Sequence, residues 1–239
     1  QRSIPLTTGF SRIWQNIGKT QNKGIELSLN GILVDTKDIQ WDMNLNMSVN
    51  ENKIISLTND QDDISNKWFI GKPINVIYDY EKAGIWQTNE AAEAAKYNAQ
   101  PGDRKILDAK KDYVINGEDR DFCGVSTPKY YGSFTNTFSY KGIELSAMFS
   151  YSIGGYVYDR DKIMILHSGS AAGRSWSTEM LDRWTPENRY TDVPALSTTS
   201  NQWTSTSTRF LYNNSYLRLK NVMLSYSLPQ SLIRRISLS

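Results

Sequence analysis

Apolar and polar residues alternate strictly over the twelve residues 39–50, which read IQWDMNLNMSVN. The apolar positions are Ile39, Trp41, Met43, Leu45, Met47 and Val49. This period of two predicts a β-strand with one apolar and one polar face. Upstream, Ile25, Leu27 and Leu29 alternate in the same way, and the connecting GILVDTKD supplies Gly31, Asp35 and Asp38 for a turn. The two segments are therefore predicted to form a hairpin.

The same alternation recurs twice further along the chain. SFTNTFSY, Lys141-Gly142 and IELSAMFSYS predict a second hairpin, in which Ile143, Leu145, Ala147, Phe149 and Tyr151 share one face. In SYLRLKNVMLSYSLP, Leu217 and Leu219 lead one face, but Val222, Leu224 and Tyr226 lead the other. This change of phase near Lys220 and Asn221 predicts a β-bulge in a third long strand.

Two segments depart from the strand pattern. Residues Asn89 to Asn98 (NEAAEAAKYN) are rich in alanine and predict a short surface helix. Residues Gly154 to Thr208, rich in Ser, Thr, Trp and Asn, show weak periodicity over about 50 residues, which is long for a connection in a compact domain. Long segments of this kind carry function or mark disorder.

The polar positions of the strands are mostly Asn, Ser, Thr and Gln, with few charges. Small uncharged groups suit the wet interior wall of a membrane β-barrel, whose outer face is apolar and edged by aromatic girdles. Trp41, Tyr140, Tyr151 and Tyr226 stand near strand ends, where girdle residues are expected. The alternative is that they are core aromatics of a soluble sheet.

Composition excludes several classes of protein. The 239 residues carry a net charge of +2, so no global field selects for nucleic acid. One cysteine, Cys123, excludes an internal disulfide, and one histidine, His167, lies outside any nucleophile-elbow sequence and is interpreted as structural. No apolar run is long enough for a membrane helix, and no signal segment is present at the N-terminus, which leaves membrane barrels open.

Six stretches, in order, resemble the C-terminal barrel region of the SusC/RagA-type TonB-dependent outer-membrane transporters of Bacteroidetes. They are NIGKTQNKGIELSLNG, WFIGKPINVIYDYEKAGIWQT, PGDRKILDAKKDYVINGEDRDFCG, TPKYYGSFTNTFSYKGIELSAMFSYSIGG, LDRWTPENRYTDVPAL and SYLRLKNVMLSYSLP. The second is similar to the family's G-x-P-x-x-x-x-Y-x-Y-x-x-x-G-I-F-Q segment.

The resemblance implies an all-β fold, in which residues 1–239 form an antiparallel, meandering sector of a transmembrane β-barrel of about 22 strands. The plug, the N-terminal strands and the last strands are expected to lie outside these residues, and both ends of the sequence are interpreted as cuts. A closed barrel of eight strands has an interior filled by side chains, which also favours a sector over a small barrel.

The implied function is energy-coupled import of glycans, or of peptides, across the Gram-negative outer membrane. The implied partners are a SusD-like surface lipoprotein, TonB through the upstream region, the imported ligand and outer-membrane lipid. Neither a cofactor nor a nucleic acid is implied.

The region from Asp108 to Asp112 needs separate consideration, because the family commonly shows a calcium-like loop, D-x-N-x-D-G-x-I, at this point. Here Lys110 replaces the amide ligand and Tyr113 replaces the glycine. A cationic side chain in a ligand position disfavours calcium. The segment is therefore predicted to be an acidic turn closed by Asn116 and Gly117, with no metal.

Trp176, Trp184 and Trp203 are the candidate ligand-binding residues, because the apolar faces of sugar rings stack on indole while nearby amides bond the hydroxyls. They could instead fold the long segment on itself or lie at the membrane interface. No catalytic residue is predicted. A glycosidase is disfavoured because the sequence marks no carboxylate as lying in an apolar, enclosed setting. The remaining alternative is a soluble β-sandwich module that binds carbohydrate or acts as an adhesin.

Overall fold

The computed structural model describes residues 2–3, 12–13, 18–166, 173–197 and 206–229. These residues divide into two compact units. The sheet unit comprises Gln1–Ile74, Thr127–Gly155 and Asn214–Ser239, and the loop unit comprises Asn75–Ser126 and Tyr156–Asn213. Each excursion of the loop unit is therefore an insertion between two strands of the sheet unit.

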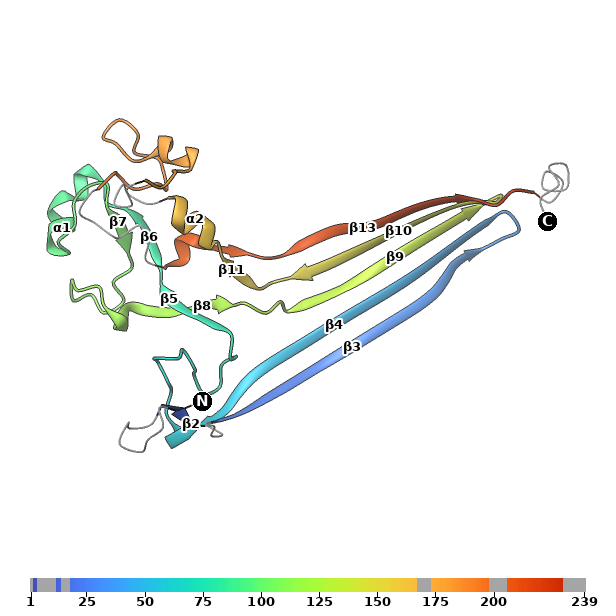
Figure 1. Ribbon diagram of the computed structural model, residues 1–239, viewed down its shortest axis with the longest axis horizontal. Helices are drawn as coiled ribbons and strands as arrows, with labels where there is room; N and C mark the ends of the chain where they lie inside the picture. The colour runs from blue at the N-terminus through green and yellow to red at the C-terminus, as the bar shows by residue number, and fades with distance from the viewer. Residues whose placement is uncertain (1, 4–11, 14–17, 167–172, 198–205, 230–239) are drawn as a thin grey trace. The chain divides into compact units, whose positions relative to one another are not determined.

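Five long strands form the antiparallel sheet of the sheet unit, in the order β13-β10-β9-β4-β3 (Figure 1). They are β3 (Gly18–Asp35), β4 (Ile39–Leu57), β9 (Tyr130–Tyr140), β10 (Ile143–Ile153) and β13 (Tyr216–Tyr226). Both predicted hairpins are confirmed, because β3 pairs with β4 and β9 pairs with β10. The order follows the sequence, as expected of a meander.

The turns that close the hairpins are short. Lys141 and Gly142 both adopt positive φ, 47° and 87°, which is the geometry of a two-residue hairpin turn. In the first hairpin the prediction for Gly31 was wrong: β3 continues to Asp35, and Gly31 pairs with Met43 inside the ladder. The turn proper is confined to residues 36–38, where the hydroxyl of Thr36 accepts a bond from the Ile39 N–H.

The predicted bulge in the third strand is confirmed. Met148 of β10 pairs with Asn221 and Phe149 pairs with Leu219, so Lys220 is the extra residue of β13. The bulge brings Leu217 and Leu219 onto the same face as Val222, Leu224 and Tyr226. The change of phase in the sequence is thus cancelled in the sheet.

Register places the alternating apolar residues of all five strands on one face, whereas Ile32, Met148 and Met223 lie on the other. One row crosses Leu29, Leu45, Phe134, Phe149 and Leu219. Phe134 and Phe149 stack with their ring centroids 4.8 Å apart, and Trp41 stacks on Phe138 at 5.1 Å. Asn136 is an amide on this face, and its Oδ1 accepts a bond from the Trp41 indole N–H.

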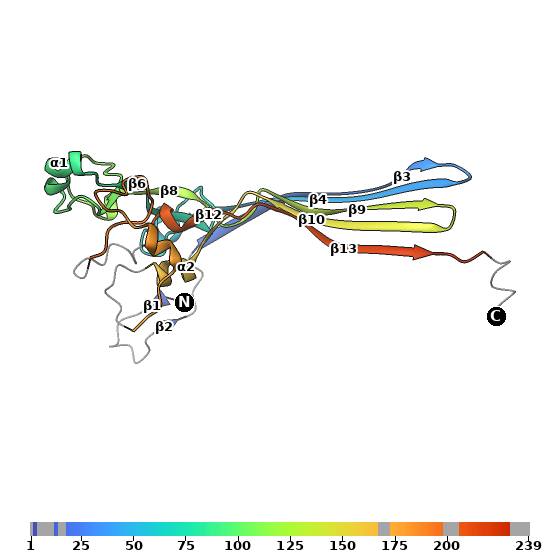
Figure 2. The same ribbon diagram turned by 90° about the horizontal axis from the view of Figure 1, so that it is seen from above.

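The apolar face is not sealed against a second sheet within the described part of the sheet unit, which forms a single layer over these strands (Figures 1 and 2). A sandwich would enclose Met43, Leu45 and Phe149, but each is only partly buried. Ile25 is 73% exposed and Leu224 is 72% exposed. The architecture is therefore that of an open antiparallel barrel wall and not of a β-sandwich.

The predicted girdle residues lie near the two ends of the sheet. Tyr140 and Tyr226 both lie opposite Ile143, at the end with the short turns, and Trp41 lies one row inward. Tyr151 lies near the opposite end, where it pairs with Gly132 and donates its hydroxyl proton to the Asn46 carbonyl at 3.2 Å. The Tyr151 side chain of β10 therefore reaches across Gly132 of β9 to Asn46 of β4 and links three strands. Aromatic side chains placed across glycines in this way reinforce sheets.

The loop unit consists of short elements. The first excursion holds β5 (Val76–Tyr80), β6 (Lys82–Ile85), α1 (Ala91–Lys96), β7 (Arg104–Ile106) and β8 (Arg120–Val125), and the second holds β11 (Tyr156–Tyr158), α2 (Arg160–Ile165) and β12 (Leu211–Asn213). Short 3₁₀ helices span Thr58–Asp60, Thr88–Glu90, Gly117–Asp119, Thr178–Asp182 and Thr208–Phe210. β1 (Arg2–Ser3) pairs with β2 (Arg12–Ile13). The helix predicted over 89–98 is confirmed as α1 with the preceding 3₁₀ helix.

The core of the loop unit is small. Leu166, Met180, Val193 and Phe210 pack together, and Tyr158 and Ile163 cover them. Among the described residues, no helix has the length and apolar content needed to cross a membrane.

Candidate functional site

The polar face of the sheet carries a ladder of neutral hydrogen bonds. Ser28 donates to Asn46, Asn46 to Asn44, and Asn44 to Asn30. The hydroxyls of Thr137 and Ser146 continue the pattern across β9 and β10 at 3.1 Å. A hollow of about 320 Å³ lies on this face, lined by Asn30, Gly31, Ile32, Asp42, Met43, Asn44, Thr135 and Thr137. The face presents amides and hydroxyls, which suit a ligand whose polar groups can replace water in these hydrogen bonds.

The two excursions of the loop unit are tied together by polar contacts. The Lys82 N–H donates to the Thr208 hydroxyl at 2.8 Å, and the Ala195 N–H donates to the Gly102 carbonyl at 2.8 Å. The Trp184 indole N–H donates to Gln87 Oε1 at 3.0 Å. Residues that are about 90 to 130 positions apart thereby form one scaffold.

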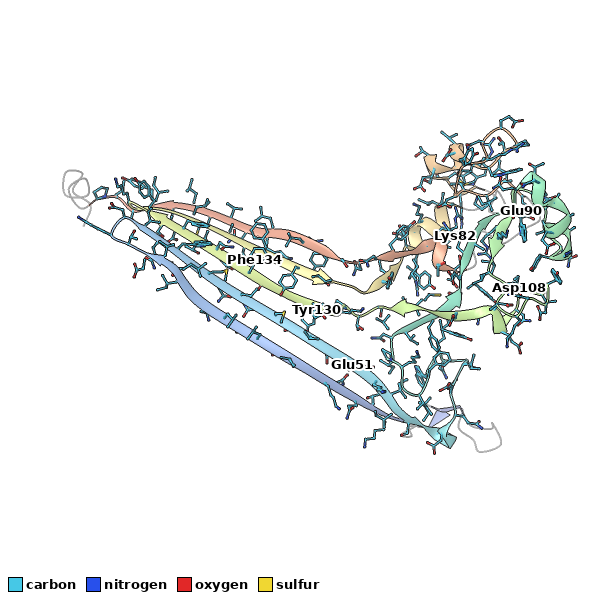
Figure 3. The ribbon with its side chains drawn as sticks, turned by 180° about the vertical axis from the view of Figure 1, so that it is seen from behind. Glu51, Lys82, Glu90, Asp108, Tyr130 and Phe134 are labelled. Atoms are coloured by element: carbon cyan, nitrogen blue, oxygen red, sulfur yellow. The ribbon has the colours of Figure 1, made fainter. Side chains whose placement is uncertain are left out.

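A polar groove of about 600 Å³ runs between the two excursions within the loop unit. Its walls are Ala83, Gly84, Ile85, Gln87, Glu90 and Lys105 on one side, and Asp182, Arg189, Tyr190, Thr191 and Asp192 on the other. Lys82 and Glu90, labelled in Figure 3, belong to the ion pairs that flank it. The Tyr190 side chain is fully exposed, so its ring is available to a ligand.

Charges around the groove are paired. Lys82 Nζ lies 2.9 Å from Asp192 Oδ2, and Lys105 Nζ lies 2.7 Å from Glu90 Oε1. The bond from Lys105, with one from the Gln87 N–H, lowers the pKa of Glu90 and keeps it ionised. Paired charges offer hydrogen-bonding groups without a net field, which favours neutral hydroxyl or amide ligands over polyions.

A second, more enclosed space, here called the Trp86 cavity, has a volume of about 190 Å³. It is lined by Trp86, Tyr97, Ala99, Arg104, Ile106 and Ile115. The rings of Trp86 and Tyr97 lie 5.4 Å apart, and the Tyr97 hydroxyl donates to Asp108 Oδ2 at 3.1 Å. Burial, assisted by this bond, raises the pKa of Tyr97, so the phenol stays a donor.

A buried polar cluster lies behind the cavity. Burial and the neighbouring Arg209 lower the pKa of Arg104 to about 10, so the guanidinium remains charged at neutral pH. Asp79, 1% exposed, offsets part of this charge and accepts a bond from the Tyr158 hydroxyl at 2.8 Å. Burial and this carboxylate raise the pKa of Tyr158 far above its ordinary value.

The structure separates the three tryptophans named from the sequence. Trp176 is 48% exposed, whereas Trp184 is 6% exposed and covered against Gly102, so its ring face is not open to a ligand in this conformation. Trp203 and His167 lie outside the described residues. Ligand binding by Trp176, Trp184 and Trp203 stays a prediction, and neither Trp176 nor Trp184 lines the groove or the Trp86 cavity.

Sequence reasoning missed Trp86, Tyr97 and Arg104. A signal was available for Trp86, because it stands where the resembled G-I-F-Q segment has phenylalanine. None was available for Arg104, whose charge interacts electrostatically with Asp79 and Arg209, distant in sequence.

The carboxylates of the loop after β7 bind backbone N–H groups. Asp108 Oδ1 accepts the Lys111 N–H at 2.5 Å, and its Oδ2 accepts the Tyr113 N–H at 2.9 Å. Asp112 accepts the Val114 N–H, and both oxygens of Asp119 accept backbone N–H groups. These carboxylates thus help to fold the chain as an acidic turn, and the absence of a metal here stays a prediction.

The loop after β7 still has, at Tyr113, the backbone conformation that glycine adopts most readily. Tyr113 adopts φ of 66°, in the left-handed region that favours glycine. Asn116 accepts the Glu118 N–H and begins the 3₁₀ helix Gly117–Asp119. Among the described residues, no three His, Cys, Asp or Glu side chains converge on a common point.

Comparison with known proteins assigns the family. No family model matches the chain. TonB-dependent receptor P3 of Formosa agariphila is 31% identical over 99% of this chain and 24% of its own length. TonB-dependent receptor SusC of Bacteroides thetaiotaomicron is 27% identical over 94% of this chain and 22% of its own length.

Solved structures agree with the sequence relatives. The RagAB peptide transporter matches with a TM-score of 0.76 at 29% identity, over 96% of this chain and 25% of that one. The RagAB peptide importer in its 'open-open' state matches with a TM-score of 0.73 at 29% identity, over 97% of this chain and 25% of that one. These relatives are receptors and transporters, and the chain spans about a quarter of their length. The chain belongs to the SusC/RagA-type TonB-dependent receptors, and its sheet is a sector of their antiparallel barrel wall.

Proposed function

We propose that residues 1–239 form the C-terminal part of an outer-membrane barrel that imports oligosaccharides or peptides with energy delivered through TonB. A SusD-like surface lipoprotein is the proposed partner above the barrel. The observation that carries the proposal is the two-faced sheet, apolar and exposed on one side and lined by neutral amides and hydroxyls on the other. The relatives that match nearly the whole chain support it.

The dimensions of the sheet suit a bilayer. The 11 residues of β9 rise about 34 Å along the strand, which is about 26 Å along the membrane normal at a tilt of 40°. Outer-membrane barrels carry an apolar band about 25 Å tall between aromatic girdles. Tyr130 and Tyr140 stand at the two ends of β9, at this spacing.

The connections give the proposed orientation. Short turns lie at residues 36–38 and 141–142, whereas the excursions of the loop unit leave from the other end of the sheet. Barrels of the outer membrane have short periplasmic turns and long extracellular loops. We therefore assign the groove and the Trp86 cavity to the extracellular side, where a ligand first arrives.

Single cysteines in the full-length receptor test location and orientation together. Glu187→Cys and Lys37→Cys are each introduced in a Cys123→Ser background and treated with a membrane-impermeant maleimide on intact cells. Glu187→Cys should be labelled on intact cells, and Lys37→Cys should react only after the outer membrane is opened. The reverse pattern contradicts the orientation, and recovery of the receptor in the soluble fraction contradicts the membrane assignment.

Uptake of labelled ligands tests the activity and separates the two ligand classes. Cells that express the receptor should accumulate either fluorescent oligosaccharides or fluorescent peptides, and the accumulation should cease when TonB is deleted. Uptake of both classes that persists without TonB contradicts the proposal.

A further inference from the structure

Strands β3 and β4 run past the rest of the sheet at the end from which the excursions leave, here called the loop end. They contain 18 and 19 residues, whereas β9, β10 and β13 contain 11 each. The last pair between β4 and β9 is Ser48 with Tyr131, so residues 49–57 of β4 lie beyond β9. Figure 3 labels Glu51 on this extension and Tyr130, the aromatic residue at which β9 begins. The extension therefore starts at the level of the aromatic girdle.

The apolar face of the sheet changes character where the extension starts. The rows that cross β3 and β4 on this face are Leu29 with Leu45, Leu27 with Met47 and Ile25 with Val49, followed by Lys23 with Glu51, Gln21 with Lys53 and Lys19 with Ser56. The bulge at Ile55 keeps Lys19 and Ser56 on this face. Each of the three rows beyond the apolar band thus carries one lysine.

The three ammonium groups are available to a ligand. Lys19, Lys23 and Lys53 are all exposed, and none of them forms an ion pair within the part of the chain that the structure describes. Glu51, opposite Lys23, is the one carboxylate on these three described rows. Three lysines against one glutamate leave a net charge of +2 on the rows.

The depth of the lysine rows matches the headgroup layer of a bilayer. Successive rows on one face are about 6.8 Å apart along a strand, or about 5 Å along the membrane normal at a tilt of about 40°. The rows of Lys23 and Lys53 therefore lie about 5 and 10 Å beyond the last apolar row, and the polar layer of a bilayer is about 5–8 Å thick on each side. Long lysine side chains can reach along the surface to charges at that depth.

The opposite end of the sheet has no such excess of charge. The residues at and beside its short turns, Asp35, Lys37, Asp38 and Lys141, carry two positive and two negative charges. Over the described rows of β3 and β4, the apolar face is therefore bordered by basic residues at the loop end alone. A surface that is apolar below and basic above complements an amphiphile with acyl chains and an anionic headgroup.

We propose that the outer face of β3 and β4 binds a phosphorylated glycolipid of the outer leaflet, with its acyl chains along the apolar rows and its phosphates at Lys23 and Lys53. Lys19 lies on the next row outward and adds to the positive field. The inference rests on the proposed function to the extent that this face meets lipid and the loop end is extracellular. Lipid A, the anchor of lipopolysaccharide, has this chemistry.

Binding of lipid to the purified full-length receptor in detergent tests the site. The probes are diphosphoryl lipid A, the same lipid with both phosphates removed, and inorganic phosphate as a competitor, measured by native mass spectrometry. One lysine close to an anionic lipid strengthens binding about fivefold, so the phosphorylated lipid should bind about tenfold or more tightly than the dephosphorylated one. Equal affinities overturn the role of the lysines, and displacement by an equal concentration of inorganic phosphate overturns the role of the apolar rows.

Two matched double variants localise the binding. Lys23→Gln with Lys53→Gln should weaken binding of diphosphoryl lipid A about tenfold or more. Lys37→Gln with Lys141→Gln removes the same charge at the opposite end and should leave the affinity unchanged. An unchanged affinity in the first double variant, or an equal loss in both, contradicts the proposal.

A third variant should act in the opposite direction. Glu51→Gln removes the carboxylate from the lysine rows and should strengthen binding of diphosphoryl lipid A by about two- to fivefold. Damage to the fold would not produce such a gain. Weaker binding in Glu51→Gln contradicts the proposal.

The two proposals fail separately, because lipid binding in detergent requires neither TonB nor transport. Selective binding of diphosphoryl lipid A by a receptor that imports nothing contradicts the proposed function and leaves the lipid assignment standing. TonB-dependent import by a receptor that does not distinguish the two lipids contradicts the lipid assignment alone.

Discussion

The sheet unit and the loop unit bury their apolar residues in opposite ways. Among the described residues, all the fully buried hydrophobic side chains except Ile54 and Phe69 belong to the loop unit. The sheet instead displays leucines and isoleucines along a face that has no cover within its own unit. The loop unit therefore has an apolar core of its own, whereas the stability of the sheet depends on an apolar surrounding such as lipid.

The hydrogen bonds between polar side chains also differ between the two units. The sheet carries neutral side-chain bonds between adjacent strands, such as Ser28 to Asn46. The loop unit uses charged groups that join distant segments, such as Tyr158 to Asp79. Repeated weak hydrogen bonds between strands give a uniform sheet, whereas a few strong hydrogen bonds fix the positions of the loops that form a site.

The largest expected effect is a charge on the apolar face of the sheet. Leu219→Arg should destabilise the folded receptor in lipid by about 2–4 kcal/mol, because Leu219 lies midway along the strands and an arginine there enters the bilayer core. The control is Asn221→Arg, on the polar face of the same strand, where Arg218 is already present. For both variants, the fraction folded in vesicles is measured from the heat-dependent change in gel mobility. Equal losses in the two variants would mean that the faces are not distinguished by lipid.

The second effect concerns the loop unit alone. Tyr158→Phe removes the donor to the buried Asp79 carboxylate and should destabilise the loop unit by about 1.5–3 kcal/mol. Hydrogen exchange of residues 75–126 and 156–213 should accelerate, while that of the long strands stays unchanged. Faster exchange throughout the sheet would show that the two units do not unfold independently.

The third effect concerns strand packing in the sheet. A Cβ at Gly132 would lie 2.0 Å from the Asn46 carbonyl oxygen, so Gly132→Ala should cost about 1–3 kcal/mol. Gly31→Ala is the matched control, because a Cβ there meets nothing within 4 Å. Urea-dependent unfolding of the two variants in vesicles compares them, and an equal midpoint would refute the predicted clash.

The regular part of the fold was predictable because its signals are local. Period two identified the central strands, and the change of phase at Lys220 identified the bulge that register then confirms. The outer part of the first hairpin was missed, because residues 18–24 (GKTQNKG) do not alternate although they lie in β3. Pairing with β4, rather than the pattern of its own residues, makes that segment a strand.

The candidate site was less predictable because it depends on contacts through space. The long segment after Gly154 was expected to carry function or to mark disorder, but its sequence does not show that it packs on residues 75–126. Trp184 was named as a candidate ligand-binding residue, with folding of the long segment on itself as the alternative, and it lies in the interior, bonded to Gln87. The electrostatic interaction of Arg104 with Asp79 likewise relates β7 to β5, which no periodicity indicates.

The smallest expected effect is a pH dependence confined to the loop after β7. Some desolvation acts against ionisation, but the N–H groups of Tyr113 and Lys111 and the Tyr97 hydroxyl together lower the pKa of Asp108 below 3.8. A carboxyl whose pKa is lowered by folding stabilises the fold above its unfolded pKa and loses that contribution as the pH falls through the folded value. Order in the loop should therefore persist at neutral pH and decline below pH 3.8.

The emission of Trp86, which is in contact with Tyr97, reports this change in the full-length receptor after the other tryptophans are replaced by phenylalanine. Asp108→Asn should abolish the transition, because an amide oxygen accepts bonds without titrating. A transition of equal size in Asp108→Asn would assign it to another group. If the transition is absent from both proteins, the Tyr97 wall of the cavity does not depend on ionised Asp108, and the sheet and the loop unit differ less in their use of charge than these contacts indicate.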